Sequence, residues 1–117
     1  MAGMIRKHGD DTAVVHLCGA LTHAVFDRFA ALLDHLDRSD ARCFVVDMSE
    51  VDFIDSSGIG MLLMAQELAE HRECAYRLRG VTPVARAILE QARVNELFVL
   101  EPAPGGATPG GSDSAAA

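Results

Sequence analysis

The stretch that decides the fold reads Val45-Val46-Asp47-Met48-Ser49-Glu50-Val51-Asp52-Phe53-Ile54-Asp55-Ser56-Ser57-Gly58-Ile59-Gly60. It begins in an apolar run, residues 43–46, which is typical of a central strand buried on both faces. We expect residues 47–55 to form a loop, because this segment carries four acidic side chains: Asp47, Glu50, Asp52 and Asp55. A helix is then predicted from about Ser57 to His71.

Strand and helix patterns alternate on either side of this stretch. Strands are expected at residues 13–18 and 75–79, a weaker one at 4–7, and a short strand or docked segment at 97–100. Helices are expected to begin at Thr22 and at Thr82-Pro83, where Thr caps the helix and Pro suits its first position. Strands separated by helices need crossover connections, so the pattern predicts an α/β domain with a mostly parallel sheet.

Composition narrows the class of protein. The chain has 117 residues, 50% of them hydrophobic, and a net charge of −7. One domain is expected over residues 1–101, followed by a disordered tail, residues 102–117, which holds no large apolar side chain. The acidic balance argues against nucleic acid and against an anionic membrane as partners. No apolar run is long enough for a membrane span or an export signal, so we expect a cytoplasmic protein.

Metal and redox sites find no support in the sequence. The three cysteines, Cys18, Cys43 and Cys74, are far apart and form no Cys-x-x-Cys pair. The five histidines show no metal-ligand spacing. We therefore expect no metal and no cofactor, with the cysteines acting as small buried hydrophobic residues.

The Asp-Ser-Ser-Gly block at residues 55–58 is the candidate site. Backbone N–H groups at a helix start lack internal partners, and the helix dipole makes that end partly positive. A hydroxyl there either caps the helix or accepts a phosphate that the helix end tolerates. Capping alone is the commoner situation, but one cap needs one polar side chain and three occur in a row. Gly58 and Gly60 leave room for a partner's backbone to approach.

The predicted helix over residues 57–71 is apolar almost all round. A helix on a sheet needs one apolar stripe, so the second arc, with Met61 and Met64, is a candidate partner-binding patch. The alternative is that other parts of the same domain cover this arc.

The sequence resembles the STAS-domain anti-sigma-factor antagonists, the anti-anti-sigma proteins of bacterial partner-switching systems. The resemblance covers about residues 4–100. It is carried by the segments at 14–21 (VVHLCGAL), 44–49 (FVVDMS), 51–60 (VDFIDSSGIG) and 78–84 (LRGVTPV). It implies the STAS fold, a small mixed sheet with helices packed mainly on one face.

The resemblance also implies a site and partners. Ser57 matches the family's phosphoacceptor serine, and Ser56, Asp55, Gly58 and Gly60 match its neighbours. Together with the apolar arc of the predicted helix, this gives the expected partner-binding residues Asp55, Ser56, Gly58, Ile59, Gly60, Met61 and Met64. The implied partners are an anti-sigma factor that is also a serine kinase, which brings ATP and Mg²⁺, and a phosphoserine phosphatase. The unphosphorylated form would bind the kinase and free the sigma factor, and phosphorylation of Ser57 would switch binding off.

The chain departs from the family pattern at three places. Gly19-Ala20-Leu21-Thr22 stands where Gly-Glu-Leu-Asp is frequent, Glu73-Cys74 where a glycine usually precedes the next strand, and Arg93-Val94-Asn95 where a glycine often follows the third helix. None of these departures touches the phosphoacceptor block, so they bear on the identity of the partner more than on the mechanism.

Two other functions are open from the sequence. The first is a STAS scaffold subunit of a transporter or larger signalling assembly that is never phosphorylated, because one fold hosts several roles. The second is an enzyme, which we do not expect, because no nucleophile elbow, P-loop or dinucleotide motif occurs. Oligomeric state is expected to be a monomer or weak dimer.

Overall fold

One mixed sheet organises the chain in the computed structural model, which describes residues 2–8 and 11–102. Its strands lie in the order β1-β2-β3-β4-β5, with β1 antiparallel to β2 and every other neighbouring pair parallel. The strand bounds are β1 Ala2–His8, β2 Thr12–Leu21, β3 Cys43–Ile54, β4 Ala75–Arg79 and β5 Leu100–Glu101. The prediction of a mixed, mostly parallel sheet is confirmed.

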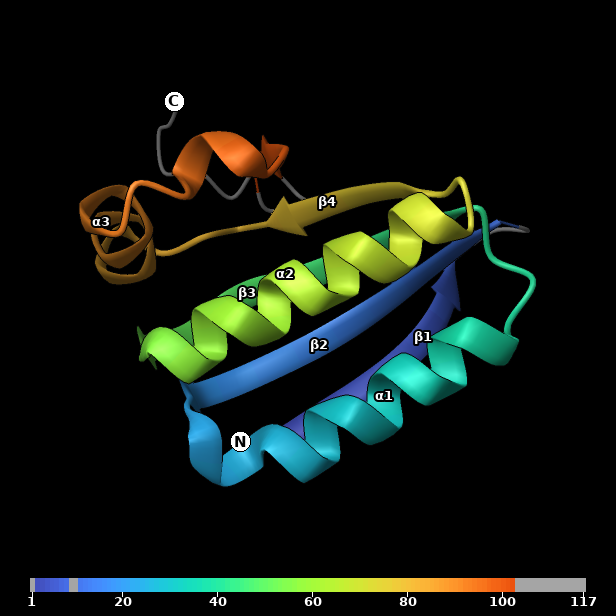
Figure 1. Cartoon of the computed structure of the whole chain (residues 1–117), viewed down its shortest axis with the longest axis horizontal. Helices are drawn as coiled ribbons and strands as arrows, with labels where there is room; N and C mark the ends of the chain where they lie inside the picture. Colours follow the sequence, from blue (N-terminus) through green and yellow to red (C-terminus); the bar gives the residue numbers. More distant parts are fainter. Residues whose placement is uncertain (1, 9–10, 103–117) are drawn as a thin grey trace.

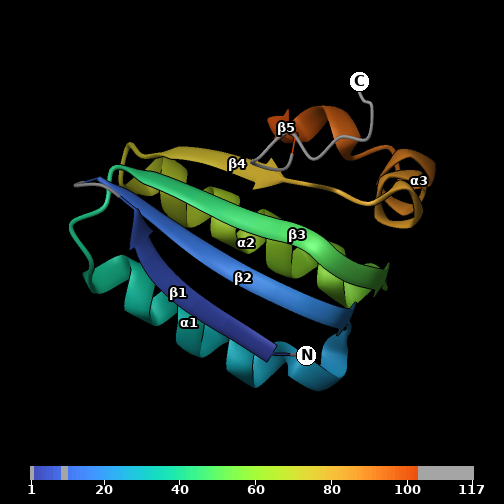
Figure 2. The same ribbon diagram turned by 180° about the vertical axis from the view of Figure 1, so that it is seen from behind.

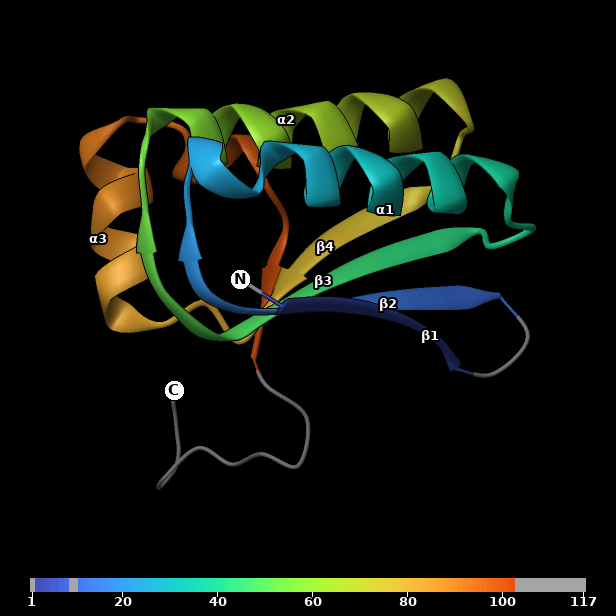
Figure 3. The ribbon, with the colours of Figure 1, turned by 90° about the horizontal axis from the view of Figure 1, so that it is seen from below.

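Two long helices cover one face of this sheet. They are α1 (Phe26–Arg38) and α2 (Ser56–His71), which lie side by side above the strands (Figures 1 and 3). The shorter α3 (Pro83–Gln91) packs at one end of the sheet, and single turns of 3-10 helix, η1 (His23–Val25) and η2 (Asn95–Leu97), precede α1 and β5. Seen from behind, no helix of the described residues covers the opposite face (Figure 2).

The core lies between this sheet and its two helices. Alternate residues of β2 and β3 face the helices, and Phe44 and Leu62 are fully buried there with Phe29 of α1. Tyr76 of β4 is also buried, which raises the pKa of its phenol, and its hydroxyl donates to the Leu62 carbonyl at 2.9 Å. The apolar side chains of the strands therefore form the surface of the sheet against which α1 and α2 pack.

Residues 47–55 do not form the loop that we expected from their acidic side chains. β3 continues through Ile54 and stays paired with the end of β2, where Gly19 faces Val51 and Leu21 faces Ile54. Register shifts in this pairing bend the two strands, and Gly19 adopts a φ of 83° there. Figure 3 shows both strands curving toward the helices. The side chains of Glu50 and Asp52 are exposed to solvent on this curved pair of strands, so a strand accommodates them.

Tail residues 103–117 lie outside the described part of the chain, and the prediction of disorder there is not tested. The remaining boundaries agree with the sequence to within a few residues. Thr82 caps α3 through the backbone N–H of Ala85, with Pro83 in the first turn. Thr22 caps η1, so α1 starts one turn later than its cap suggests.

Helix α2 begins in close contact with the end of β2. Gly58 is buried, and a Cβ atom added to it would overlap the carbonyl oxygen of Leu21 and come within 2.8 Å of the Ile54 Cγ2 atom. Gly60 has nothing within 4 Å of the same position. Gly58 therefore lacks a side chain because of internal packing, and the expectation that it clears space for a partner is wrong. Gly60 alone leaves open space.

Replacing these two glycines should have opposite effects on stability. We expect Gly58→Ala to lower the free energy of unfolding by about 3 kcal/mol, because backbone must move to admit the methyl group. Gly60→Ala should leave it unchanged or raise it by up to about 1 kcal/mol, since Ala favours helix and the space is open. Urea unfolding followed by circular dichroism measures both changes, and equal losses in the two variants would contradict the packing described here.

Helices α2 and α3 both end in a Schellman motif without glycine. At the end of α2 the N–H of Cys74 donates to Ala69 at 2.7 Å, and Glu73 holds the left-handed position with a φ of 58°. At the end of α3 the N–H of Val94 donates to Leu89 at 3.0 Å, and Arg93 holds that position with a φ of 64°. These are two of the places where the chain lacks the glycine of the resembling family.

Glycine at either position should stabilise the domain. A side chain in the left-handed region costs about 1–2 kcal/mol, and glycine avoids this cost. Part of the gain is lost, because glycine also raises the conformational entropy of the unfolded chain. We expect Glu73→Gly and Arg93→Gly each to raise the free energy of unfolding by about 0.5–1 kcal/mol. Glu70→Gly, inside α2, is the matched control and should lower it by a similar amount. A loss of stability in all three variants would contradict this reading of the helix ends.

Candidate functional site

Asp55 joins the start of α2 to the start of η1. Its Oδ1 accepts a hydrogen bond from the Gly58 backbone N–H at 2.8 Å, and its Oδ2 accepts one from the His23 backbone N–H at 3.4 Å. The Asp55 N–H donates to the Leu21 carbonyl at 3.2 Å. The sequence marked Asp55 as a partner-binding residue, and here it is the N-cap of α2 and a link between two neighbouring connections.

Ser56 and Ser57 form the first two positions of α2, and both are exposed. Because Asp55 supplies the cap, neither serine is needed for it, and the alternative that they serve only as caps does not hold. The Ser57 hydroxyl has no hydrogen-bond partner among the described residues. It therefore stands free in solvent, beside the backbone N–H groups of the first helical turn.

A shallow cavity lies beside Ser57, between the starts of α1 and α2. Its volume is about 550 Å³, and its lining residues are His23, Ala24, Phe26, Asp27 and Ser57. The Phe26 side chain is 42% exposed, because α1 begins only after η1 and Phe26 occupies its first position.

Phe53 is a second exposed aromatic residue close to Ser57 in the sequence. It is the second-last residue of the curved strand β3, two residues before the Asp55 cap, and its side chain is 48% exposed. Ile59 and Gly60, in the first turns of α2, are half-buried. The exposed surface at the start of α2 thus combines a free hydroxyl with the exposed Phe26 side chain, which lines the same cavity, and such a combination is typical of a protein-binding surface. No sequence pattern identified Phe53 as a surface residue, because the apolar residues Val51 and Ile54 on either side of it are buried and only packing separates them.

The second apolar arc of α2 is mostly covered by the domain itself. Met61 and Ala65 are each 1% exposed, so the expectation that Met61 belongs to an open patch is wrong. Met64 is 39% exposed and does lie at the surface. The cause is helical spacing: the buried residues of α2 are Gly58, Met61, Leu62, Ala65 and Ala69, which lie on one face of the helix. Met61 therefore belongs to the core-facing stripe. Beside this stripe the Gln66 side chain donates to the Leu97 carbonyl of η2 at 2.8 Å.

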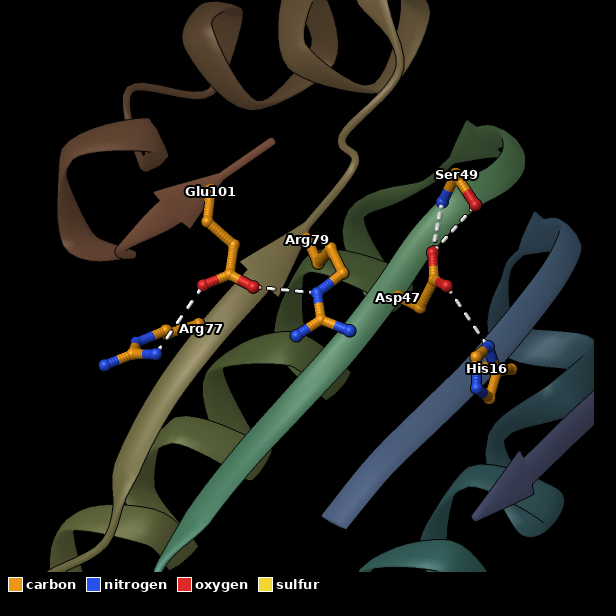
Figure 4. A network of polar contacts seen from close by, with 6 residues as sticks. All are labelled: His16, Asp47, Ser49, Arg77, Arg79 and Glu101. Carbon is orange, nitrogen blue, oxygen red and sulfur yellow. Dashed lines mark hydrogen bonds and ion pairs between the residues drawn. The ribbon is translucent and has the colours of Figure 1, made fainter. Parts of the chain in front are cut away.

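The helix-free face of the sheet carries a separate polar network (Figure 4). Asp47 of β3 lies 3.1 Å from His16 Nδ1 and accepts hydrogen bonds from the Ser49 backbone N–H at 3.0 Å and hydroxyl at 2.7 Å. Burial raises the pKa of this carboxyl, but the hydrogen bonds from Ser49 and the contact with His16 outweigh it, so the pKa of Asp47 is lowered. The Ser49 hydroxyl donates to the carboxylate and not to the imidazole, so this is not the arrangement of a nucleophilic triad.

The same face holds a second ion-pair cluster on β4 and β5. The Glu101 carboxylate lies 2.7 Å from Arg79 Nε and 3.7 Å from an Arg77 guanidinium nitrogen. In Figure 4 the two clusters lie side by side on neighbouring strands. The ion pairs of Glu101 link β5, which pairs with β4 over only two residues, to the sheet.

The described residues, 2–8 and 11–102, contain neither a metal-binding cluster nor a membrane-spanning helix. No group of three or more His, Cys, Asp or Glu side chains there is arranged to hold a metal ion. Within the same residues no helix has both the length and the apolar character of a membrane span.

The fold of this chain is similar to that of several known proteins. No curated protein sequence matches the chain. Among solved structures, the anti-sigma factor antagonist SpoIIAA in its unphosphorylated form is 21% identical, with a TM-score of 0.70 over 85% of this chain and 87% of that one. An anti-sigma factor antagonist from Mycobacterium paratuberculosis is 19% identical, with a TM-score of 0.77 over 88% and 86%. At this identity the likeness establishes the fold.

A third solved structure comes from a different class of protein. A sulfate transporter family protein from Wolinella succinogenes is 25% identical, with a TM-score of 0.64 over 76% of this chain and 75% of that one. The family model described as Mlab, STAS domain matches residues 5–101, nearly all of the described domain. The chain therefore belongs to the STAS-domain family, as its Asp-Ser-Ser-Gly helix start and one-sided helix layer indicate.

Proposed function

We propose that this protein is an anti-sigma factor antagonist controlled by phosphorylation of Ser57. Its unphosphorylated form binds an anti-sigma factor that is a serine kinase, and the bound kinase releases its sigma factor. The kinase supplies ATP and Mg²⁺, and a phosphoserine phosphatase restores the binding form. These partners act in the cytoplasm, so the function is cytoplasmic, and the chain itself catalyses no reaction.

One observation supports this proposal above the others: Ser57 is exposed and free, although it lies in a helix start that is already capped. A kinase must bring the acceptor hydroxyl into its own active site, which a buried or capping hydroxyl cannot enter. The position of Ser57 in the Asp-Ser-Ser-Gly block, which matches the phosphoacceptor of the resembling antagonists, adds to this support.

The charges around Ser57 give a reason for phosphorylation to oppose binding. A phosphate adds about −1.5 to −2 charge at neutral pH. Asp27 lines the same cavity, and Asp55 lies two residues away, while no Lys or Arg is among the lining residues. The helix dipole and the free N–H groups of the first turn tolerate the phosphate within the domain. Burying it against a partner requires a matching cation, and the side chains that line this cavity include no Lys or Arg to supply one.

The partner-binding surface in this proposal consists of residues around the phosphoacceptor. It keeps Ser56, Ile59, Gly60 and Met64 from the sequence prediction and gains Phe26 and Phe53, which are exposed. Met61 is excluded by its burial, and Asp55 and Gly58 contribute by shaping the helix start. Aromatic residues are frequent anchors of protein interfaces.

Substitution of Ser57 tests the switch. The purified protein is incubated with the anti-sigma kinase of the same organism and ATP–Mg²⁺, and phosphate is mapped by mass spectrometry. We expect phosphate on Ser57 and none in Ser57→Ala. Ser57→Asp should weaken kinase binding at least tenfold in calorimetry, or about 1.4 kcal/mol, with the thermal midpoint of the domain retained.

Ser56 provides the matched control for this experiment. Ser56→Ala should still be phosphorylated at Ser57, because the two hydroxyls occupy different positions of the first turn. Tight kinase binding by Ser57→Asp, or phosphate that maps to Ser56, would argue against the proposal.

A STAS scaffold subunit of a transporter is the second candidate function. One comparison favours it: a sulfate transporter family protein shares the fold. In this case Ser57→Ala would leave regulation in cells unchanged, whereas the switch predicts constant activity of the downstream sigma factor. A cellular reporter of that sigma factor separates the two.

A further inference from the structure

A groove runs between α1 and α2, away from the phosphoacceptor. Its volume is about 460 Å³, and Leu33, Leu68 and the 39% exposed Met64 supply its apolar side chains. The two helices lie side by side along it (Figure 1). Because the helix backbones satisfy their own hydrogen bonds, a partner can engage this groove only through side chains.

The groove is acidic on both sides. Asp34 and Asp37 of α1 and Glu67 of α2 line it and are exposed. Asp34 forms an ion pair with Arg38 at 2.5 Å, but Arg38 is not a lining residue, and the lining set contains no Lys or Arg. Carboxylates that flank an apolar floor complement a surface on which Lys or Arg flank an apolar stripe.

The length of the groove fits a short helix. On α2 its lining residues run from Met64 to His71, which is two helical turns or about 10 Å. An amphipathic helix presents apolar residues at matching intervals and inserts them between two parallel helices. We propose that this groove docks an amphipathic, basic helix of a partner protein.

A second copy of the chain does not fit this groove. Two acidic grooves repel each other, and the whole chain has a net charge of −7. The short helix α3 of a second copy carries one arginine, Arg86, and this side chain already pairs with Glu90 at 3.8 Å. A nucleic acid is excluded by the same negative charge.

The groove shares Met64 with the proposed kinase-binding surface, but it does not include the phosphoacceptor Ser57. Met64 follows Ser57 by seven residues, so it lies about 10 Å further along α2 on the same face. Binding in the groove should therefore survive Ser57→Asp with less than a twofold change, which separates a failure of this proposal from a failure of the switch.

The test uses a fluorescein-labelled, 14-residue synthetic helix made of leucine and lysine, with lysines on either side of a leucine stripe. Fluorescence anisotropy with the full chain should give a micromolar Kd, and this Kd should increase as the salt concentration rises. Met64→Glu and Glu67→Lys should each raise the Kd at least tenfold. The matched controls Val84→Glu and Glu96→Lys make the same charge changes at exposed positions outside the groove, and should change the Kd less than twofold.

Methyl NMR locates the bound helix. In protein with ¹³C-labelled methionine methyl groups, the Met64 signal should shift on addition of the peptide, while the buried Met48 signal should not. Three results would overturn the proposal: a Kd weaker than millimolar, equal losses in the control and groove variants, which would mean unspecific charge attraction, or a dimer that Met64→Glu dissolves, which would assign the groove to a second copy.

Discussion

The start of α2 rests directly on the last residue of β2, and the remaining site geometry depends on that contact. Gly58 lies against the Leu21 carbonyl, which also accepts the Asp55 N–H at 3.2 Å. Asp55 then ties the same turn to His23. Any side chain at Gly58 would push the helix away from the strand. Because this turn is held from within, the two serines that follow Asp55 carry no structural duty and face solvent.

Most of the fold was predictable from local patterns, and the errors have physical causes. Apolar runs and caps such as Thr82-Pro83 predicted the alternation of strands and helices, because they encode local structure. The acidic stretch at 47–55 was wrongly expected to be a loop. Strand pairing with Gly19 to Leu21, far away in the sequence, overrides its local composition, and one face of a curved strand pair remains in water.

The candidate site was predictable at Ser57 and less so around it. The Asp-Ser-Ser-Gly block identifies the helix start and the hydroxyl without knowledge of the rest of the chain. Exposure cannot be read in the same way, because it depends on what lies next to each residue. Met61 is buried because its side of α2 is the one that faces the core, and Phe26 is exposed at the first position of α1, which begins only after η1. Both facts belong to tertiary packing, which periodicity does not encode.

The helix ends of α2 and α3 show that this domain has not been driven to its highest stability. Glu73 and Arg93 occupy left-handed positions that glycine fills without strain. Every Glu codon and every Arg codon becomes a Gly codon through a single-base change, so mutation offers this relief in each generation. Charged residues at these two positions are consistent with selection that stops once a fold is stable enough. Glycine substitutions there remain available to offset destabilising changes elsewhere in the domain.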